Sequence, residues 1–282
     1  MLSVIIPANN EAAYIGPCLD ALLASRLAAG NDGASGPEVE ILVVANGCTD
    51  ATVAVAQERA AAAARRGWRL EVLELGAGGK LNALNVGDRT AGGEIRAYLD
   101  ADVIVSESLV AALCATLDRV TPAYASGRPV IPPTRSWVTR AYARIWQRLP
   151  FMTEGVPGCG LFAVNAAGRR RWGDFPDIIS DDTFVRLSFA PTERFAVPAP
   201  YLFPLIEGFR RLVRVRRRQN IGVAEVARLY PQLICNDDEP RMSLTRMLGI
   251  AARDPVGFIV YTAVALAVHL PAGSSAVWAR GR

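Results

Sequence analysis

Short apolar runs alternate with amphipathic segments along the first half of the chain. Apolar runs that end in polar turns are typical of buried strands. The sequence predicts such strands at residues 2–7, 39–45, 69–75 and 94–99. Between them, apolar residues recur at helical spacing, as Ile15, Leu19 and Leu22 do. This order predicts an α/β fold, a Rossmann-like domain with a mostly parallel sheet that helices cover on both faces.

The second half is less regular and ends in segments of helical character. Strand patterns occur at 123–131, 159–165 and 195–203, and helix patterns at 136–148, 183–190, 204–230 and 242–253. We expect residues 1–203 to form the α/β domain and residues 204–282 to form a basic helical extension. The apolar run 256–270 is shorter than the ~20 residues that a spanning helix needs. A helix buried in protein and a helix lying in a membrane interface therefore both stay open.

Composition narrows the class of protein. Of the 282 residues, 51% are hydrophobic and 21% are charged, as expected of a folded globular protein rather than a disordered chain. The 5 cysteines are scattered without a CxxC pair, so we expect free thiols and a cytoplasmic protein. The lone histidine, His269, excludes a His-rich metal site. The N-terminus starts directly with a strand pattern, and we expect no signal peptide.

One glycine-rich segment, residues 76–81, looks at first like a phosphate-binding loop. Leu81 stands where a Walker loop needs Ser or Thr, and where a dinucleotide fingerprint needs its last glycine. A P-loop NTPase and an NAD enzyme are therefore both disfavoured.

Two acidic pairs carry the candidate chemistry. Asp100 and Asp102 follow the strand at 94–99, at the sheet edge where α/β proteins bind ligands. Carboxylate oxygens suit Mg²⁺ or Mn²⁺, which would bridge to a diphosphate, and a solvated turn is the alternative. Asp181 and Asp182 precede a later helix, which they can cap, or they can accept a proton from a sugar hydroxyl.

Other polar residues favour an anionic, nucleotide-like ligand. The turns at 7–11 and 46–50 follow apolar strands and could hold a base and ribose by hydrogen bonds. Lys80 opens a helix beside a glycine loop and can reach a phosphate. The arginines crowded into residues 210–218 favour an anionic partner, either a donor diphosphate or an acidic lipid surface. Nucleic acid is not expected, because no aromatic residues are interleaved among these arginines.

Six segments occur in an order that resembles the glycosyltransferases of family 2, which have the GT-A fold. They are SVIIPANNEAAYIGPCL, VVANGCTDAT, GGKLNALNVG, YLDADV, GCGLFAVN and ISDDTFVRL. The resemblance covers residues 2–187. It implies an inverting enzyme that moves a sugar from a nucleoside-diphosphate sugar to an acceptor hydroxyl.

The resemblance also implies roles for residues. Asp182, with Asp181 beside it, would be the catalytic base, and Asp102 with Asp100 would bind Mg²⁺ or Mn²⁺. The donor-binding residues that it implies are Pro7, Ala8, Asn9, Glu11, Asn46, Lys80, Asp100, Arg217 and Arg218. Asn46 stands where many members of the family have an aspartate that recognises the uracil base. The residues around Arg217 depart from the QxxRW motif of polymerising members, so no processive synthase is predicted.

The expected donor is a nucleoside-diphosphate sugar, with a UDP-sugar favoured. The expected acceptor is a sugar, a polysaccharide or a lipid-linked precursor of cell-envelope polysaccharide. An anionic surface on the inner face of the cell membrane is left open as a further partner.

Two alternatives to a glycosyltransferase remain open. A sugar-phosphate nucleotidyltransferase would want a basic glycine-rich loop at residues 7–11, and a non-catalytic nucleotide-sugar-binding protein would not need both acidic pairs intact.

Overall fold

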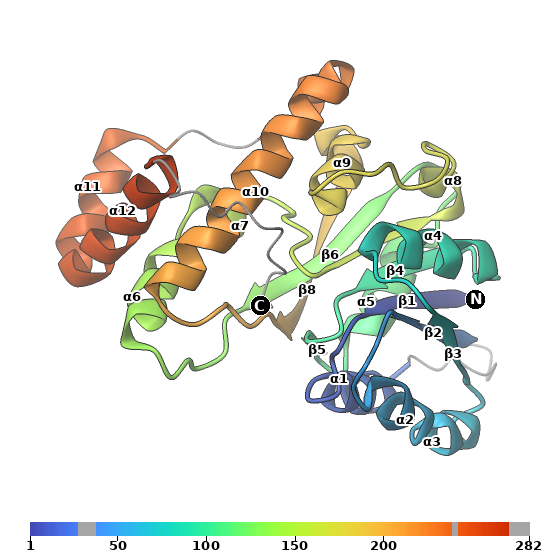
Figure 1. Cartoon of the computed structure of the whole chain (residues 1–282). Coiled ribbons are helices and arrows are strands. Elements are labelled where there is room, and N and C mark those ends of the chain that lie inside the picture. The colour runs from blue at the N-terminus through green and yellow to red at the C-terminus, as the bar shows by residue number, and fades with distance from the viewer. Residues whose placement is uncertain (28–37, 239–241, 271–282) are drawn as a thin grey trace.

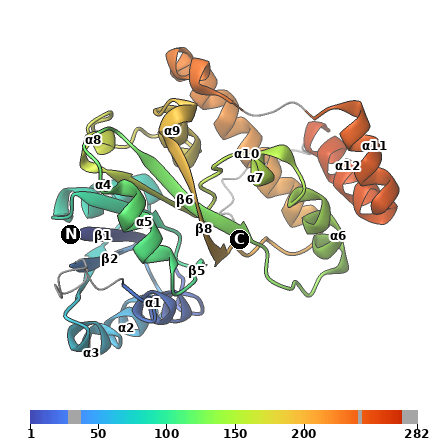
Figure 2. The ribbon, with the colours of Figure 1, turned by 180° about the vertical axis from the view of Figure 1, so that it is seen from behind.

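The structure is a computed structural model that describes residues 1–27, 38–238 and 242–270 (Figures 1 and 2). Its strands are β1 Leu2–Ala8, β2 Val39–Asn46, β3 Arg69–Leu75, β4 Ile95–Leu99, β5 Ile104–Val105, β6 Tyr124–Val130, β7 Leu161–Asn165 and β8 Arg194–Leu202. Its α-helices are α1 Ile15–Leu23, α2 Thr52–Gln57, α3 Ala60–Arg65, α4 Lys80–Thr90, α5 Leu109–Leu117, α6 Trp137–Trp146, α7 Pro150–Thr153, α8 Ala166–Arg169, α9 Asp181–Leu187, α10 Phe209–Leu229, α11 Leu244–Arg253 and α12 Pro255–His269. Short 3-10 helices lie at Pro191–Glu193 and Pro231–Asn236. Residues 239–241 and 271–282 of the predicted extension lie outside the described residues.

One mixed sheet runs through the molecule in the order β3-β2-β1-β4-β7-β6-β8-β5. Strands β3, β2, β1 and β4 are parallel, as the alternation of strands and helices predicts. Strand β7 then runs antiparallel to β4 and β6, β6 and β8 are parallel, and β5 is antiparallel to β8. The predicted α/β class is confirmed. The reversal at β7 was not predicted, because the apolar pattern of a strand does not state its direction.

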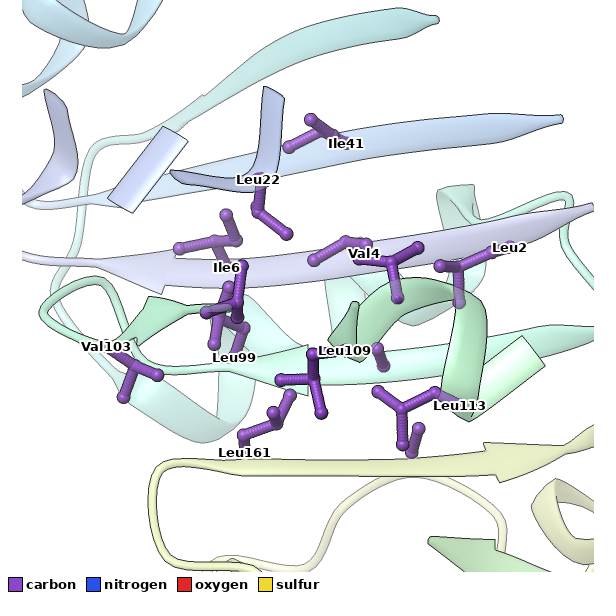
Figure 3. Close-up of a cluster of buried hydrophobic side chains, with 14 of the residues drawn as sticks. Leu2, Val4, Ile6, Leu22, Ile41, Leu99, Val103, Leu109, Leu113 and Leu161 are labelled. Atoms are coloured by element: carbon purple, nitrogen blue, oxygen red, sulfur yellow. The ribbon is translucent and has the colours of Figure 1, made fainter. Parts of the chain in front are cut away.

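Apolar side chains cover both faces of the sheet. One cluster, drawn in Figure 3, packs Val4 of β1 with Leu22 of α1 and Leu109 of α5. A second cluster, on the other face, includes Ile5 of β1 and Leu84 of α4. Successive residues of a strand point to opposite faces, and burial on both faces explains why the strands are continuous apolar runs in the sequence.

A third apolar cluster joins helices at the end of the molecule away from the N-terminus (Figures 1 and 2). It includes Trp146 of α6, Leu212 of α10 and Val264 of α12. Helix α6 thus shares a core with the C-terminal helices, although it precedes residue 203. Helix α10 has 21 residues, which is a length of about 30 Å. Its Leu212 lies in this helical cluster, and its Val226 lies in the second cluster of the sheet.

Helix α12 contains the apolar run that the sequence left open. One side of it is buried through Gly257, Val264 and Val268. The side chains of Ile259 and Leu266 are 67% and 65% exposed. Among the described residues, no helix combines the length and the apolar character needed to cross a membrane.

Candidate active site

A cleft of about 1130 Å³ is lined by two different parts of the molecule. On one side are the polar turns that follow β1, β2 and β4, the start of α4, and the turn before α9. On the other side are α6, α10 and residues 203–207. Ligands of α/β proteins bind at this edge of the sheet, because the turns after its parallel strands meet there.

Asp100 and Asp102 lie in the turn between β4 and β5, and both line the cleft. The backbone N–H of Asp100 donates to the carbonyl oxygen of Gly160 at 2.8 Å. Ala101 and Val103, which alternate with the two acids, are 4% and 0% exposed. The buried residues anchor the turn, so the two carboxylates stand on a fixed backbone.

Lys80, the first residue of α4, connects the two acidic pairs. Its Nζ lies 3.2 Å from Oδ1 of Asp100 and 3.2 Å from Oδ1 of Asp181. Burial alone would lower the pKa of Lys80, but the charges of Asp100, Asp181 and Asp182 outweigh burial and raise the pKa. Lys80 is therefore a cation at neutral pH. One ammonium group in contact with both pairs means that both belong to a single site.

Asp181 and Asp182 are the first residues of α9. Asp181 is buried, and Asp182 is partly buried with its Oδ1 accepting from the Thr183 N–H at 2.7 Å. Burial raises the pKa of Asp182 to about 6, and the charge of Asp181 adds to the rise, whereas Lys80 and the Thr183 N–H act in the opposite direction. A carboxylate with this pKa is ionised at neutral pH and is a stronger proton acceptor than an ordinary aspartate.

Helix α10 holds the turn that carries these two acids. Glu225 of α10 accepts a hydrogen bond at Oε2 from the Ile179 N–H at 2.8 Å. Gly222, one turn earlier, leaves no side chain between the helix and the turn. A Cβ atom at Gly222 would lie 2.9 Å from Cγ2 of Ile179 and closer still to Oγ of Ser180. The position of α9 therefore depends on direct contact with α10.

Asn46, at the end of β2, braces the loop before α4. Its Nδ2 donates to the carbonyl oxygens of Ala8 at 2.8 Å and Val44 at 3.3 Å, and its Oδ1 accepts from the Gly79 N–H at 2.9 Å. Both N–H groups of the amide are thereby used. Asn46 is 3% exposed, and it fixes the shape of the cleft wall.

Asn9, in the turn after β1, lines the cleft beside this brace. Its Nδ2 donates to the carbonyl oxygens of Asn46 and Gly47, and its buried Oδ1 has no hydrogen-bond partner among the described residues. Gly47 has a φ of 60°, and a Cβ there would lie 2.6 Å from the Gly78 nitrogen. A side chain at Gly47 would push the two loops apart. The turns after β1 and β2 thus form one wall, with an unused hydrogen-bond acceptor on it.

Most of the predicted site residues line the cleft, namely Pro7, Asn9, Glu11, Asn46, Lys80, Asp100, Asp102, Asp181, Asp182 and Arg218. Two predicted donor-binding residues do not. Ala8 is 0% exposed, inside the core around β1. The guanidinium group of Arg217 donates to the carbonyl oxygens of residues 267, 268 and 270 at 2.9, 3.1 and 2.8 Å. It binds the carboxyl end of α12, because neighbouring residues of a helix point in different directions.

The cleft also contains residues that were not among the predicted site residues, namely Arg135, Tyr142, Trp146, Arg211 and Arg216. Arg211 and Arg216 belong to the basic stretch 210–218. Arg216 stands four residues after Leu212, so helical spacing places it on the side of α10 that carries Leu212, but the same spacing does not place Arg211 there. Periodicity could therefore have selected Arg216. Arg135 and the α6 aromatic residues belong to no motif, and the packing of α6 against α10 brings them to the site.

Asp100 and Asp102 are the residues best suited to hold a divalent cation. In the described part of the chain, no group of three or more His, Cys, Asp or Glu side chains is arranged for a metal. A protein commonly holds Mg²⁺ by one or two carboxylates, while phosphate oxygens and water fill the other positions. The pair therefore fits a cation that binds together with a diphosphate.

Solved structures with this arrangement of strands and helices are GT-A glycosyltransferases. Mannosyltransferase PcManGT from Pyrobaculum calidifontis, solved with GDP-Man and Mn²⁺, has a TM-score of 0.59 at 22% identity, over 96% of this chain and 76% of that one. TarS 1-349 from S. aureus has a TM-score of 0.57 at 18% identity, over 92% and 70%. Glucosyl-3-phosphoglycerate synthase from Mycobacterium tuberculosis, solved with Mn²⁺, UDP and glucosyl-3-phosphoglycerate, has a TM-score of 0.53 at 18% identity, over 81% and 79%.

The chain belongs to glycosyl transferase family 2, whose model matches residues 3–173. A curated relative, the uncharacterized glycosyltransferase EpsJ of Bacillus subtilis (strain 168), is 28% identical over 109 residues. That match spans 39% of this chain and 28% of the relative. The family resemblance, the GT-A fold and the transferase class that the sequence predicted are thereby confirmed.

Proposed function

We propose that this glycosyltransferase transfers a sugar from a nucleoside-diphosphate sugar to an acceptor hydroxyl with inversion at the anomeric carbon. The observation that carries the proposal is the contact of Lys80 with both Asp100 and Asp181. It brings a candidate cation-binding pair and a candidate base into one cleft. An in-line displacement needs such an arrangement, because the leaving group and the attacking group stand on opposite sides of the reacting carbon.

The donor nucleoside lies along the wall formed by Pro7, Asn9, Glu11 and Asn46. The unpartnered Oδ1 of Asn9 accepts a hydrogen bond from the base or the ribose. Asn46 shapes this wall by holding the Gly79 loop. A UDP-sugar is the first candidate donor, and the GDP-Man bound by PcManGT makes a GDP-sugar the second.

The diphosphate lies near Lys80, Asp100 and Asp102. Asp102, with Asp100, would hold a Mg²⁺ or Mn²⁺ ion, which would supply positive charge to the departing diphosphate. Lys80 adds a second positive charge on the same side of the cleft, and Arg218 on α10 is within the same cleft. These residues orient the donor and lower the cost of separating the nucleoside diphosphate from the sugar.

Asp182 is the base that removes the proton from the attacking hydroxyl. Its raised pKa favours this role, because a base with a pKa near the working pH accepts a proton readily and is still ionised. Asp181 stays paired with Lys80 and keeps the electrostatic environment of Asp182 fixed. The products are an inverted glycoside and a nucleoside diphosphate.

The acceptor is a sugar, a polysaccharide or a lipid-linked precursor, and the enzyme contacts the inner face of the membrane. What supports the membrane contact is the apolar surface of α11 and α12, where Leu244, Leu248 and Ile259 are 71%, 66% and 67% exposed. Arg253, the exposed last residue of α11, suits an anionic headgroup. Flotation with anionic liposomes that separates the native chain from an Ile259→Gln, Leu248→Gln variant would support this contact, and equal flotation would refute it.

The decisive test of the proposed reaction is calorimetry of donor binding. We expect UDP-glucose or GDP-mannose to bind the native chain only with Mn²⁺ present, and Asp102→Ala to lose this Mn²⁺-dependent binding. Arg210→Ala, which changes an exposed arginine outside the cleft, serves as the control and should bind as the native chain does. Binding of the donor by Asp102→Ala with Mn²⁺ as tight as that of the native chain would contradict the assigned role.

A further inference from the structure

The helical end of the cleft carries more positive than negative charge. Arg135, Arg211 and Arg216 line it, and none of the three forms an ion pair with an acid among the described residues. Arg216 donates only to a neutral group, Oε1 of Gln219, at 3.0 Å. Glu207, the acid at this end, accepts hydrogen bonds from the backbone N–H groups of residues 135 and 136 at 2.8 and 3.2 Å, and it forms no ion pair with these arginines.

The charges of the cleft are separated by region. Its other acids, Glu11, Asp100, Asp102, Asp181 and Asp182, all lie on the α/β side. Cys159 also lines the cleft. Burial raises the pKa of Cys159 to about 12, so the thiol is neutral and adds no charge to the cleft. A cleft with an acidic region and a separate basic region suits two substrates of different charge.

A buried donor at the basic end also lacks a partner. Trp146 is 4% exposed and lines the cleft, and its indole Nε1–H has no hydrogen-bond partner among the described residues. A buried indole N–H usually finds an acceptor. A bound group rich in oxygen acceptors would satisfy it.

The size of the cleft leaves room for a second ligand. Its volume of about 1130 Å³ exceeds the range of about 300–1,000 Å³ that is typical of a pocket for one small molecule. In the proposed function, the nucleotide sugar binds at the turns after the strands and at Asp100 and Asp102, the pair that fits a metal. The helical end is then the place for the acceptor.

We propose that the acceptor carries a phosphate group, and that Arg135, Arg211 and Arg216 bind this group together with the Nε1–H of Trp146. This inference rests on the proposed function, because it names the chemistry of the acceptor in the same cleft. Guanidinium groups bind phosphate through paired, charge-assisted hydrogen bonds, and several unpaired arginines suit its double charge better than a neutral sugar. The phosphate belongs either to a water-soluble sugar or polyol phosphate, or to a lipid-linked precursor at a membrane surface.

The test keeps the donor site filled and measures binding of phosphate probes to the full chain. Native protein saturated with Mn²⁺ and UDP or GDP is titrated with glycerol 2-phosphate, and in a second arm with vesicles of phosphatidylcholine containing phosphatidic acid. The variant Arg211→Gln with Arg216→Gln removes two charges from the cleft and leaves Arg218 in place. The matched control, Arg210→Gln with Arg214→Gln, removes two exposed charges from the same helix outside the cleft.

We expect the Arg211, Arg216 variant to bind at least one probe at least about tenfold more weakly than the control does. A loss confined to glycerol 2-phosphate indicates a soluble acceptor, and a loss confined to phosphatidic acid vesicles indicates a lipid-linked one. Equal binding by the variant and the control, or no probe binding to the native complex, would overturn the proposal. So would competition between the probe and the nucleotide, because the arginines would then bind the donor diphosphate. A native chain that binds no nucleotide with Mn²⁺ would instead contradict the proposed function itself.

Discussion

The α/β side of the cleft and its helical end hold their charged groups in different ways. On the α/β side, acids and amides stand in turns after buried strands, and hydrogen bonds such as Asp100 N–H to Gly160 fix the backbone. At the helical end, arginines extend from α10 and from the loop before α6, and nearby helices expose apolar residues such as Leu248. Groups that must be placed to within a fraction of an ångström need the rigid part of a fold. Shifts in the positions of groups at the helical end should cost less activity. We therefore assign partner recognition to the helical end.

The largest effect is expected on the α/β side, at Asp182. Asp182→Asn keeps the shape of the side chain but cannot accept the acceptor proton, so turnover should fall by at least about 10². Binding of the nucleotide with Mn²⁺ should be nearly unchanged, because Asp102 and Lys80 are intact. Single-turnover assays with calorimetry on the same protein measure both quantities. Full activity in this variant would refute the base assignment.

The pH dependence of the reaction should report the same carboxylate. Since the pKa of Asp182 is raised to about 6, the base is progressively protonated below that pH, and kcat/KM should fall about tenfold per unit there. Above that pH, Asp182 is fully ionised and should cause no further change in kcat/KM. A bound cation would lower the midpoint, so we expect it at or below about 6. A profile of kcat/KM from about pH 5 to about pH 8 tests this, and the residual activity of Asp182→Asn should lack the step.

Much of the α/β side could be predicted from the sequence. Buried strands such as β1 and β2 are continuous apolar runs, and the turns after them follow from the rule for parallel sheets. Lys80, Asp100 and Asp182 could be named because each stands at the start or end of such an element. The contact of Lys80 with Asp181 could not be predicted, since it joins segments about a hundred residues apart whose relative position depends on the antiparallel strands β6 and β7.

The helical end was predicted less well for a physical reason. A basic helix reveals its charge in the sequence but not the surface against which it packs. Arg217 was expected at the donor, and it binds the end of α12. Arg216, its neighbour, was not named as a site residue, and it lines the cleft. Which of Arg216 and Arg217 faces the cleft depends on the position of α10 between the sheet and α12, and the sequence does not show this position.

A smaller effect tests whether α10 connects the two regions. Gly222→Ala places a methyl group against Ile179 and Ser180, which must move. We expect kcat to fall about tenfold, and the free energy of unfolding to fall by about 1–3 kcal/mol, the usual cost of overpacking. Gly249→Ala in α11 is the matched control, because nothing lies within 4 Å of its Cβ. It should stabilise the protein by about 0.4–1 kcal/mol and leave kcat unchanged. Equal activity of the two variants would show that the α9 turn is held without α10.

The smallest effect is expected at Arg217. Arg217→Gln removes a cation from the last carbonyl groups of α12, where a positive charge favours the helix end. We expect a loss of about 1 kcal/mol in the free energy of unfolding, measured in urea, and no change in nucleotide affinity with Mn²⁺. Arg214→Gln, an exposed arginine on the same helix, should change neither. If Arg217→Gln instead weakens nucleotide binding about tenfold and leaves stability intact, Arg217 reaches the donor when the ligand is bound. The helical end would then share in holding the donor, and the division between a rigid donor side and a variable partner side would fail.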